Sequence, residues 1–175
     1  MKDILLSHGY FLGQDPKEQE IMKPYPPLGL LYLSAYLKQN GFAVEIFDST
    51  FAEIDHFAEY LNTQRPKLVG LYSNLMTKFS VLEMIKRAKE QNCIVIVGGP
   101  DPPNYAEQYL DFGADVVVIG EGEETLQELI PILTEGKCAQ LAAVAGIVFK
   151  DEAGRIQHTL PRRLLPDLDA LPAPD

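Results

Sequence analysis

Short apolar runs alternate with longer segments of helical periodicity along most of this chain. Five runs have the length of buried strands, and they lie at 3–7, 43–47, 67–72, 94–97 and 115–119. Apolar residues recur at helical spacing at 27–39, 51–63, 78–91, 104–112 and 123–134, the last segment being interrupted by Pro131. Strands that alternate with helices indicate βαβ units. We therefore predict a doubly wound α/β domain with a mainly parallel five-stranded sheet of the Rossmann or flavodoxin-like type.

The carboxyl-terminal part of the chain has a different pattern. Two short apolar stretches, Gly146–Lys150 and Arg155–Thr159, flank the turn-forming residues 151–154 and predict a β-hairpin. Residues 161–175 hold four prolines and follow neither a strand nor a helix period. Because proline fixes φ and removes a backbone donor, we expect an extended tail there. The predicted organisation is a domain at 1–160 and a linker at 161–175 that leads to a further domain.

Two loops at strand ends are the best candidates for a binding site. Gly98-Gly99-Pro100 follows one buried run, and Ser73 to Met76 follows the run before it. Ligands of open parallel sheets bind outside the carboxyl ends of the strands. Adjacent glycines let a flat ligand approach the backbone, and a serine hydroxyl can donate or accept a hydrogen bond. We expect a valine at Gly98 or at Gly99 to abolish binding while the domain still folds.

The loop after the first strand, residues 8–26, is long for a connection between a strand and a helix, and long loops are often functional. His8 is the one histidine near the predicted site. A lone histidine at a strand end is more often a hydrogen-bonded structural residue than a metal ligand. His56 and His158 are predicted to be solvated. We find no recognisable catalytic constellation in the sequence, and we assign no catalytic residue and no metal ligand.

Other ligands of this fold class fit the sequence less well. A flavodoxin-like site needs a serine- and threonine-rich loop after the first strand, and a phospho-acceptor domain needs carboxylates at the ends of the first and third strands. Neither is present. Gly120-Glu121-Gly122 begins a partial dinucleotide motif whose last glycine is missing, and its carboxylates would repel a pyrophosphate. Glu123 and Glu124 are better explained as complements to the positive end of a helix, while the glycines can approach a ligand.

Composition narrows the class of protein further. The chain has 25 acidic and 15 basic residues and a net charge of −10, whereas nucleic-acid-binding proteins normally present a basic face. Two cysteines are too few for a disulfide framework or a thiolate metal site. The sequence has neither a signal peptide nor an apolar run long enough to span a membrane. We therefore expect a cytoplasmic protein that binds no nucleic acid and no membrane.

Several motifs in order resemble the amino-terminal cobalamin-binding domain of radical S-adenosylmethionine (SAM) enzymes. They lie at residues 25–33, 98–102, 113–125 and 167–172, and the resemblance covers almost the whole chain. It implies cobalamin bound at the carboxyl edge of the sheet. It also implies a radical SAM barrel in the same protein, beyond residue 175, which alone would hold S-adenosylmethionine and a [4Fe-4S] cluster. Methyl transfer, rearrangement or cyclisation would need both domains, so this segment alone should not catalyse.

The resemblance also assigns residues to the cofactor. Ser73, Leu75, Gly98 and Gly99 match positions that cradle the nucleotide tail of cobalamin. The family's Asp-x-His-x-x-Gly motif is not matched, because Leu6 and Phe11 stand where its aspartate and glycine would be around His8. We therefore expect cobalt without a histidine ligand, its lower face meeting Leu75, Met76 or Tyr10. The candidate cofactor-binding residues are Ser7, His8, Gly9, Tyr10, Pro27, Leu28, Gly29, Ser73, Asn74, Leu75, Met76, Gly98, Gly99, Pro100, Gly120, Glu121 and Gly122.

Two alternatives remain open at this point. The domain could keep the fold, lose the cofactor and act as a non-catalytic interaction module, since fold does not fix function. It could also hold a different nucleotide-like ligand at the same edge. The missing histidine motif favours the first of these alternatives over the second.

Overall fold

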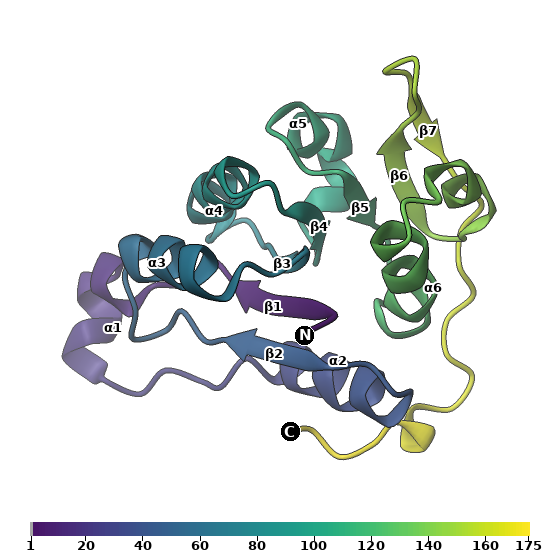
Figure 1. The fold of residues 1–175 in the computed structure, drawn as a ribbon. Helices are drawn as coiled ribbons and strands as arrows, with labels where there is room; N and C mark the ends of the chain where they lie inside the picture. The colour runs from purple at the N-terminus through teal and green to yellow at the C-terminus, as the bar shows by residue number, and fades with distance from the viewer. Residues whose placement is uncertain (1) are drawn as a thin grey trace.

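The structure, a computed structural model, describes residues 2–175 and is built on one seven-stranded sheet (Figure 1). The strand order is β2-β1-β3-β4-β5-β6-β7. The strands are β1 (Ile4–His8), β2 (Val44–Phe47), β3 (Leu68–Tyr72), β4 (Ile94–Gly98), β5 (Val116–Val118), β6 (Ile147–Lys150) and β7 (Ile156–His158). The first five strands are parallel to one another. β6 pairs antiparallel with β5, and β7 pairs antiparallel with β6. The doubly wound α/β fold predicted from the sequence is confirmed.

Helices cover both faces of the sheet, as Figure 1 shows. Helices α3, α4 and α5 lie on one face, and α2 and α6 lie on the other. The helices are α1 (Pro16–Ile21), α2 (Leu28–Gln39), α3 (Ile54–Gln64), α4 (Lys78–Glu90), α5 (Ala106–Asp111) and α6 (Glu123–Thr134). Short 3₁₀ turns lie at Leu12–Gln14, Pro102–Asn104, Cys138–Ala143 and Leu168–Ala170. None of the helices in residues 2–175 combines the length and the apolar character needed to cross a membrane.

The strand count differs from the predicted five because the carboxyl-terminal hairpin joins the main sheet. β6 pairs with β5 through Val116↔Phe149 and Val118↔Ile147, and β7 pairs with β6. The hairpin itself was predicted, but its partner was not. Ile147 and Val148 are buried, so the hairpin covers the edge of β5 and is held there by apolar contacts.

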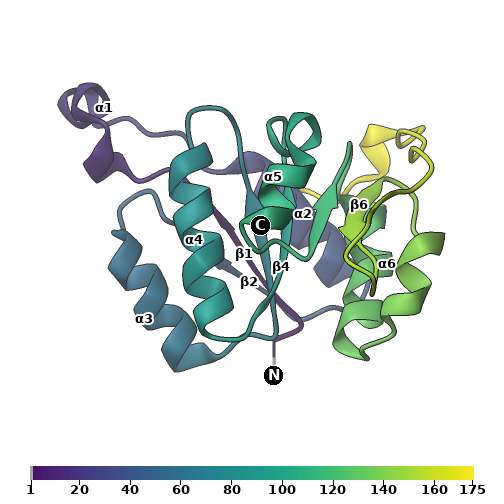
Figure 2. The ribbon, with the colours of Figure 1, turned by 90° about the horizontal axis from the view of Figure 1, so that it is seen from above.

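Two local predictions also changed. Helix α6 continues through Pro131 to Thr134, because Leu129, Ile130 and Leu133 are buried against the sheet and outweigh the lost backbone hydrogen bond. Helix α1 forms within the long loop after β1. Asp15 caps it by accepting a hydrogen bond from the N–H of Glu18, although none of its residues is buried. Figure 2 shows α1 standing apart from the other helices.

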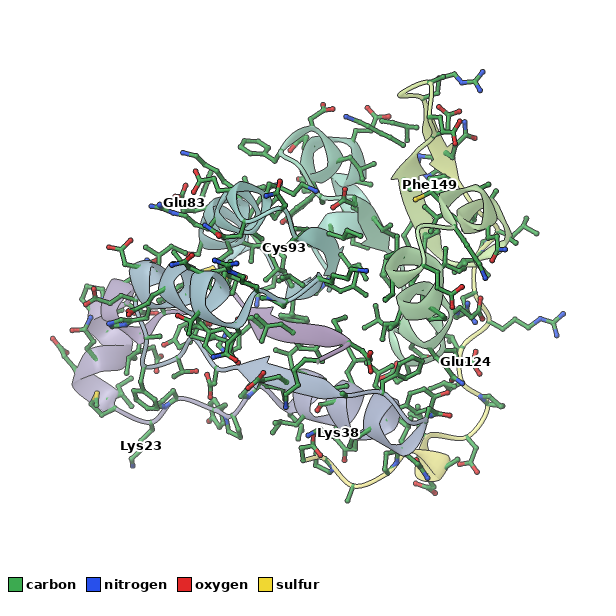
Figure 3. The ribbon with its side chains drawn as sticks, viewed as in Figure 1. Lys23, Lys38, Glu83, Cys93, Glu124 and Phe149 are labelled. Atoms are coloured by element: carbon green, nitrogen blue, oxygen red, sulfur yellow. The ribbon has the colours of Figure 1, made fainter. Side chains whose placement is uncertain are left out.

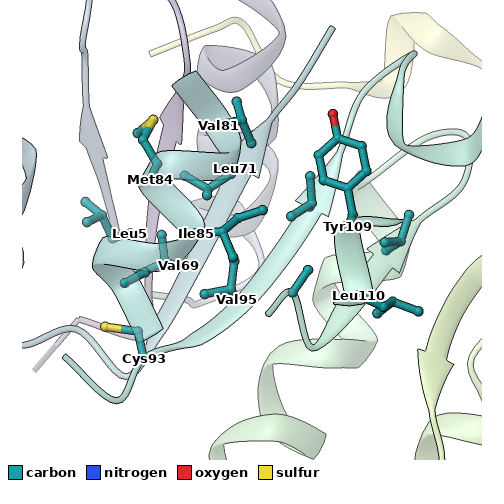
Figure 4. Close-up of a cluster of buried hydrophobic side chains, with 14 of the residues drawn as sticks. Leu5, Val69, Leu71, Val81, Met84, Ile85, Cys93, Val95, Tyr109 and Leu110 are labelled. Carbon is teal, nitrogen blue, oxygen red and sulfur yellow. The ribbon is translucent and has the colours of Figure 1, made fainter. Parts of the chain in front are cut away.

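The face under α3, α4 and α5 is packed continuously with apolar side chains. Figure 4 shows this cluster, in which Val69 and Val95 from the strands meet Ile85 and Met84 from α4 and Tyr109 from α5. All five side chains are fully buried. Interiors packed at this density tolerate few voids. The cluster in Figure 4 therefore supports the sheet and leaves no space among its own side chains.

The tail lies along α6 and α2 (Figures 1 and 3). The Arg162 guanidinium donates to Glu124 (3.2 Å) and to Glu128 (2.8 Å) on α6. Further along, the carboxylate of Asp175 accepts hydrogen bonds from Ser34 and from the ammonium group of Lys38 on α2. The tail thus contacts both helices of the α2/α6 face. That it serves as a linker stays a prediction.

Candidate functional site

A cavity of about 220 Å³ opens between the sheet and the helices α2 and α6. We call it the slot. The strands contribute Leu6, Gly70, Ile96, Gly98 and Val118 to its wall. The helices and the loop before α6 contribute Leu30, Leu33, Gly122 and Leu126. The slot therefore lies at the carboxyl end of the central strands, where open α/β sheets bind ligands.

Two strand glycines line the slot, and they differ in whether the space beside them is filled. Gly98 and Ile96 lie two residues apart on β4, so both positions point to the same side of the sheet. A Cβ built on Gly98 would meet only Val118, at 3.7 Å. Gly70 occupies the middle of β3, and the side chain of Leu6 leans over it, 2.7 Å from where its Cβ would be. Glycine weakens a strand interior and often marks the close approach of a ligand. At Gly98 the space freed by the missing side chain stays open.

A wider cavity, of about 510 Å³, adjoins the slot. We call it the shelf. Gly29, Leu30 and Tyr72 line both the shelf and the slot, so the two cavities are neighbours. One wall is formed by the end of β1 and the segment that follows it, with His8, Tyr10, Asp15, Glu18, Pro24 and Tyr25. The start of α2 contributes Pro27 and Leu28, and the loop after β3 contributes Asn74, Met76 and Thr77. The long loop whose function was predicted thus forms one wall of the larger cavity.

The predicted site residues divide into three groups. The slot is lined by Gly29, Gly98, Gly99, Gly120, Glu121 and Gly122. The shelf is lined by His8, Tyr10, Pro27, Leu28, Gly29, Asn74 and Met76. The remaining candidates, Ser7, Gly9, Ser73, Leu75 and Pro100, line neither cavity. Gly70, Leu6, Leu33 and Leu126 line the slot but were not predicted.

Gly99 has a structural role that the sequence did not reveal. Its φ is +107°, and a Cβ there would lie 2.3 Å from the carbonyl oxygen of Ser73. No side chain fits so close to backbone, and L-residues rarely adopt this φ. The structure argues against the expectation that Gly99→Val would leave the domain folded. At Gly98, by contrast, a side chain would occupy the slot without colliding with the backbone.

Ser73 uses its hydroxyl inside the protein. The side chain is fully buried and lies 2.7 Å from the hydroxyl of Tyr109, which donates to Asp101 at 2.7 Å. The ammonium group of Lys78 lies 3.4 Å from the same Asp101 carboxylate and 3.6 Å from the ring centroid of Tyr105. Burial raises the pKa of Tyr109, and the hydrogen bond to Asp101 and the Asp101 charge add to this against the opposing hydrogen bond with Ser73, so the phenol remains a donor. This network joins the loops that follow β3 and β4.

Three other candidates, Ser7, Gly9 and Asn74, make contacts within the protein that hold the strand ends and loops in position. The Ser7 hydroxyl donates to the carbonyl oxygen of Phe47 at 2.7 Å and joins β1 to β2. Gly9 is packed so closely that a Cβ would lie 2.5 Å from a methyl group of Val81. The Asn74 side-chain oxygen accepts from the backbone N–H groups of Met76 and Thr77, both at 3.0 Å. These bonds fix a turn that leaves Met76 exposed at the shelf.

Both ring nitrogens of His8 are engaged. Nδ1 accepts from the N–H of Tyr10 at 3.2 Å, so Nε2 carries the proton and donates to Asp48 at 3.0 Å. Burial lowers the pKa of His8 below its ordinary value, against the opposing effect of Asp48. Burial alone would raise the pKa of Asp48, but hydrogen bonds from Thr50 and His8 hold it below the ordinary value. His8 is therefore a neutral, hydrogen-bonded residue at the back of the shelf.

Within residues 2–175, no group of three or more His, Cys, Asp or Glu side chains is arranged to hold a metal ion. The charged groups of the slot belong to Glu121 and Glu123, in the loop before α6 and its first turn. The Glu121 carboxylate already accepts the N–H of Leu165 from the tail, at 2.7 Å. The slot is thus an apolar recess with charge near its loop side.

Comparison with known proteins agrees with this geometry. Residues 20–130 match the family model for the B12 binding domain. An uncharacterized methyltransferase of Pyrococcus horikoshii is 31% identical over 158 residues, which are 85% of this chain and 33% of that protein. An anaerobic magnesium-protoporphyrin IX monomethyl ester cyclase of Synechocystis is 30% identical over 162 residues, 88% of this chain and 31% of that protein. The chain thus spans about a third of the length of these relatives.

Solved structures extend the comparison to the fold. The cobalamin-dependent S-adenosylmethionine radical enzyme OxsB, with aqua-cobalamin bound, superposes with a TM-score of 0.73 at 26% identity. The match covers 92% of this chain and 22% of that one. The radical S-adenosylmethionine methyltransferase TsrM of Kitasatospora setae, with cobalamin and a [4Fe-4S] cluster bound, gives a TM-score of 0.71 at 23% identity and shows the same fold. It covers 91% of this chain and 31% of that one.

Proposed function

The chain belongs to the B12-binding domain family, and we propose that it binds cobalamin, with the nucleotide tail in the slot and the corrin ring on the shelf. The observation that carries this proposal is the open recess at Gly98, which lies next to the wider shelf and shares Gly29, Leu30 and Tyr72 with it. A flat macrocycle with a long appended base needs such a pair of neighbouring spaces. An apolar cleft that offers few polar groups is also typical of cofactor sites.

The residues of the slot would contact the nucleotide tail, and those of the shelf would contact the corrin ring. Leu6, Ile96 and Val118 give the slot an apolar floor that excludes water from around a bound base. The shelf would place Asn74 and Met76 beneath the ring and the loop after β1 at its side. When bound, cobalamin supplies the cobalt chemistry, while the protein positions and shields it.

The lower face of the ring would lack a histidine ligand. His8 holds the Tyr10 N–H with one nitrogen and Asp48 with the other, so neither nitrogen is free without breaking a hydrogen bond. Leu75 and Met76 project at the tip of the loop after β3 and are among the most exposed apolar side chains. We assign to this loop, together with Tyr10, the contact with the lower face.

The activity of the whole protein would require a second domain. The relatives named above are about three times as long as this chain and include a methyltransferase and a cyclase. We assign to the protein that carries this chain a methyl transfer or a rearrangement or cyclisation. Its radical SAM barrel would hold S-adenosylmethionine and the [4Fe-4S] cluster and would follow the linker at 161–175. This chain would supply cobalamin and no catalytic residue.

Equilibrium dialysis against cobalamin tests the proposal directly. We expect near-stoichiometric retention by the protein that carries this chain. Cobinamide, which has the corrin ring but no nucleotide tail, should bind about 100-fold more weakly, because it leaves the slot unfilled. Equal retention of the two would place the tail outside the slot. No retention of either would favour the alternative, a non-catalytic interaction domain that has lost cobalamin.

A further inference from the structure

The slot and the shelf differ in the chemistry that they offer. The deep wall of the slot is made of Leu6, Ile96, Val118, Leu126 and Leu30, each at most 5% exposed. The shelf instead brings together Asp15, Glu18, Asn74 and Thr77 with its apolar residues. A ligand therefore meets polar side chains across the shelf, whereas inside the slot the only charged side chains lining it, within residues 2–175, are Glu121 and Glu123 on its loop side.

The backbone of the slot floor offers no replacement partners. Leu6, Gly70 and Ile96 lie side by side in the parallel ladder of β1, β3 and β4, in the register Leu6↔Gly70↔Ile96. Ile96 continues the ladder by pairing with Val116 of β5. Backbone donors and acceptors in such a ladder are used between the strands. A polar atom buried against this floor would stay unpaired, which is costly.

From this difference we infer that the slot selects among cobamides by the base at the end of the nucleotide tail. It favours an apolar base such as the dimethylbenzimidazole of cobalamin over a purine such as adenine. The inference rests on the proposed function, since it assumes that the tail enters the slot. Adenine carries ring nitrogens that accept hydrogen bonds, and they would lose their water without gaining donors, because the carboxylates of Glu121 and Glu123 could accept only from its exocyclic amine. The methyl groups of dimethylbenzimidazole would instead gain contact with apolar side chains.

Leu33 provides the variant that tests this inference. It lines the slot but not the shelf, and its methyl groups come within 3.5 and 3.7 Å of the Cβ position of Gly122. Because Leu33 is only partly buried, Leu33→Gln should fold and place an amide at the slot wall. Leu28→Gln is the matched control. It makes the same change on the same helix, but Leu28 lines the shelf alone.

The experiment measures the dissociation constants of cobalamin and of the adenine-containing cobamide for all three proteins. We expect the unaltered protein to bind cobalamin about tenfold tighter. Leu33→Gln should reduce that ratio about fivefold, whereas Leu28→Gln should leave it unchanged. Using the ratio across variants cancels the intrinsic difference between the free cofactors. Thermal unfolding followed by circular dichroism confirms that each variant is folded.

The outcomes separate this inference from the proposed function. If both cobamides bind the unaltered protein equally well, or if Leu33→Gln leaves the ratio unchanged, base selection by the slot is wrong, while cobalamin binding stands. If Leu28→Gln changes the ratio as much as Leu33→Gln, the base lies on the shelf and the inference is also wrong. If neither cobamide binds the unaltered protein, the proposed function itself fails.

Discussion

The two faces of the sheet use the same strands for opposite purposes. On the α3/α4/α5 face, Val69 and Leu71 of β3 and Val95 and Val97 of β4 are buried without a gap. On the α2/α6 face, alternate residues of the same strands include Gly70 and Gly98, and a cavity lies beside them. Side chains of a strand alternate between faces, so one strand can fill one face and leave the other open. The α2/α6 face keeps open space beside Gly98, whereas the side chain of Leu6 lies over Gly70.

The hollow face has compensating contacts at its outer side. The Tyr36 hydroxyl of α2 donates to the Gln127 side chain of α6 at 2.9 Å. The tail adds the ion pairs of Arg162 with α6 and of Asp175 with Lys38 of α2. The packed face relies on apolar contact and on the Ser73–Tyr109–Asp101 hydrogen bonds instead. The hollow face should therefore respond to changes that leave the packed face unaffected.

The largest expected effect is that of Gly98→Val on binding. Its branched side chain would fill the space beside Val118 where the tail should enter. We predict that affinity for cobalamin falls about 100-fold or more, measured by equilibrium dialysis. Stability to urea should stay the same or rise, because valine favours strands more than glycine does. Normal binding by a folded Gly98→Val variant would show that the ligand does not lie against β4.

A substitution three residues earlier on the same strand should do the opposite. Val95 is fully buried on the packed face. Val95→Ala should destabilise the domain by about 2 kcal/mol, because it leaves a cavity among side chains that cannot collapse. Affinity for cobalamin, measured on the folded fraction, should not change. A loss of affinity as large as that of Gly98→Val would mean that the two faces are coupled, and the comparison between them would break down.

The sequence predicted the packed face better than the hollow one. Alternating apolar runs and helical periodicity located the five parallel strands, the turn signal at 151–154 located the hairpin, and the glycine pair at 98–99 pointed to the edge of the sheet where the slot lies. Gly70 was missed because a glycine within the run Leu68–Tyr72 does not disturb the apolar pattern. The separate roles of Gly98 and Gly99 were also out of reach, since only the structure shows which of them meets the Ser73 carbonyl. The hydroxyl of Ser73 was assigned to a ligand because its partner, Tyr109, lies 36 residues away.

A moderate effect is expected where the tail meets the hollow face. The Arg162 side chain is 12% exposed and reaches both Glu124 and Glu128. Arg162→Ala should lower stability by about 1 kcal/mol, since the pair is only partly buried. It should also speed the dissociation of cobalamin by about threefold, because α6 walls the slot. Stopped-flow displacement measures the rate. Arg163→Ala is the control, because within residues 2–175 the neighbouring Arg163 forms no ion pair with a carboxylate. Equal effects of the two variants on the dissociation rate would show that the ion pairs of Arg162 with α6 do not control the release of cobalamin.

The smallest effect concerns the pH dependence of the loop that walls the shelf. His8 has a pKa below its ordinary value of 6.5, chiefly because it is buried. The unfolded chain therefore binds a proton at a higher pH than the folded one does, and the contribution of His8 to stability, present above pH 6.5, declines as the pH falls toward the folded pKa. Protonation of Nδ1 would also remove the acceptor of the Tyr10 N–H. We predict that His8→Gln flattens the decline in stability as the pH falls below 6.5, measured by urea unfolding at each pH. Val95→Ala should shift the same curve downward without changing its slope, since it acts on the other face. A slope unaltered in His8→Gln would show that another group accounts for the acid sensitivity and that the neutral His8 contributes nothing to holding the loop.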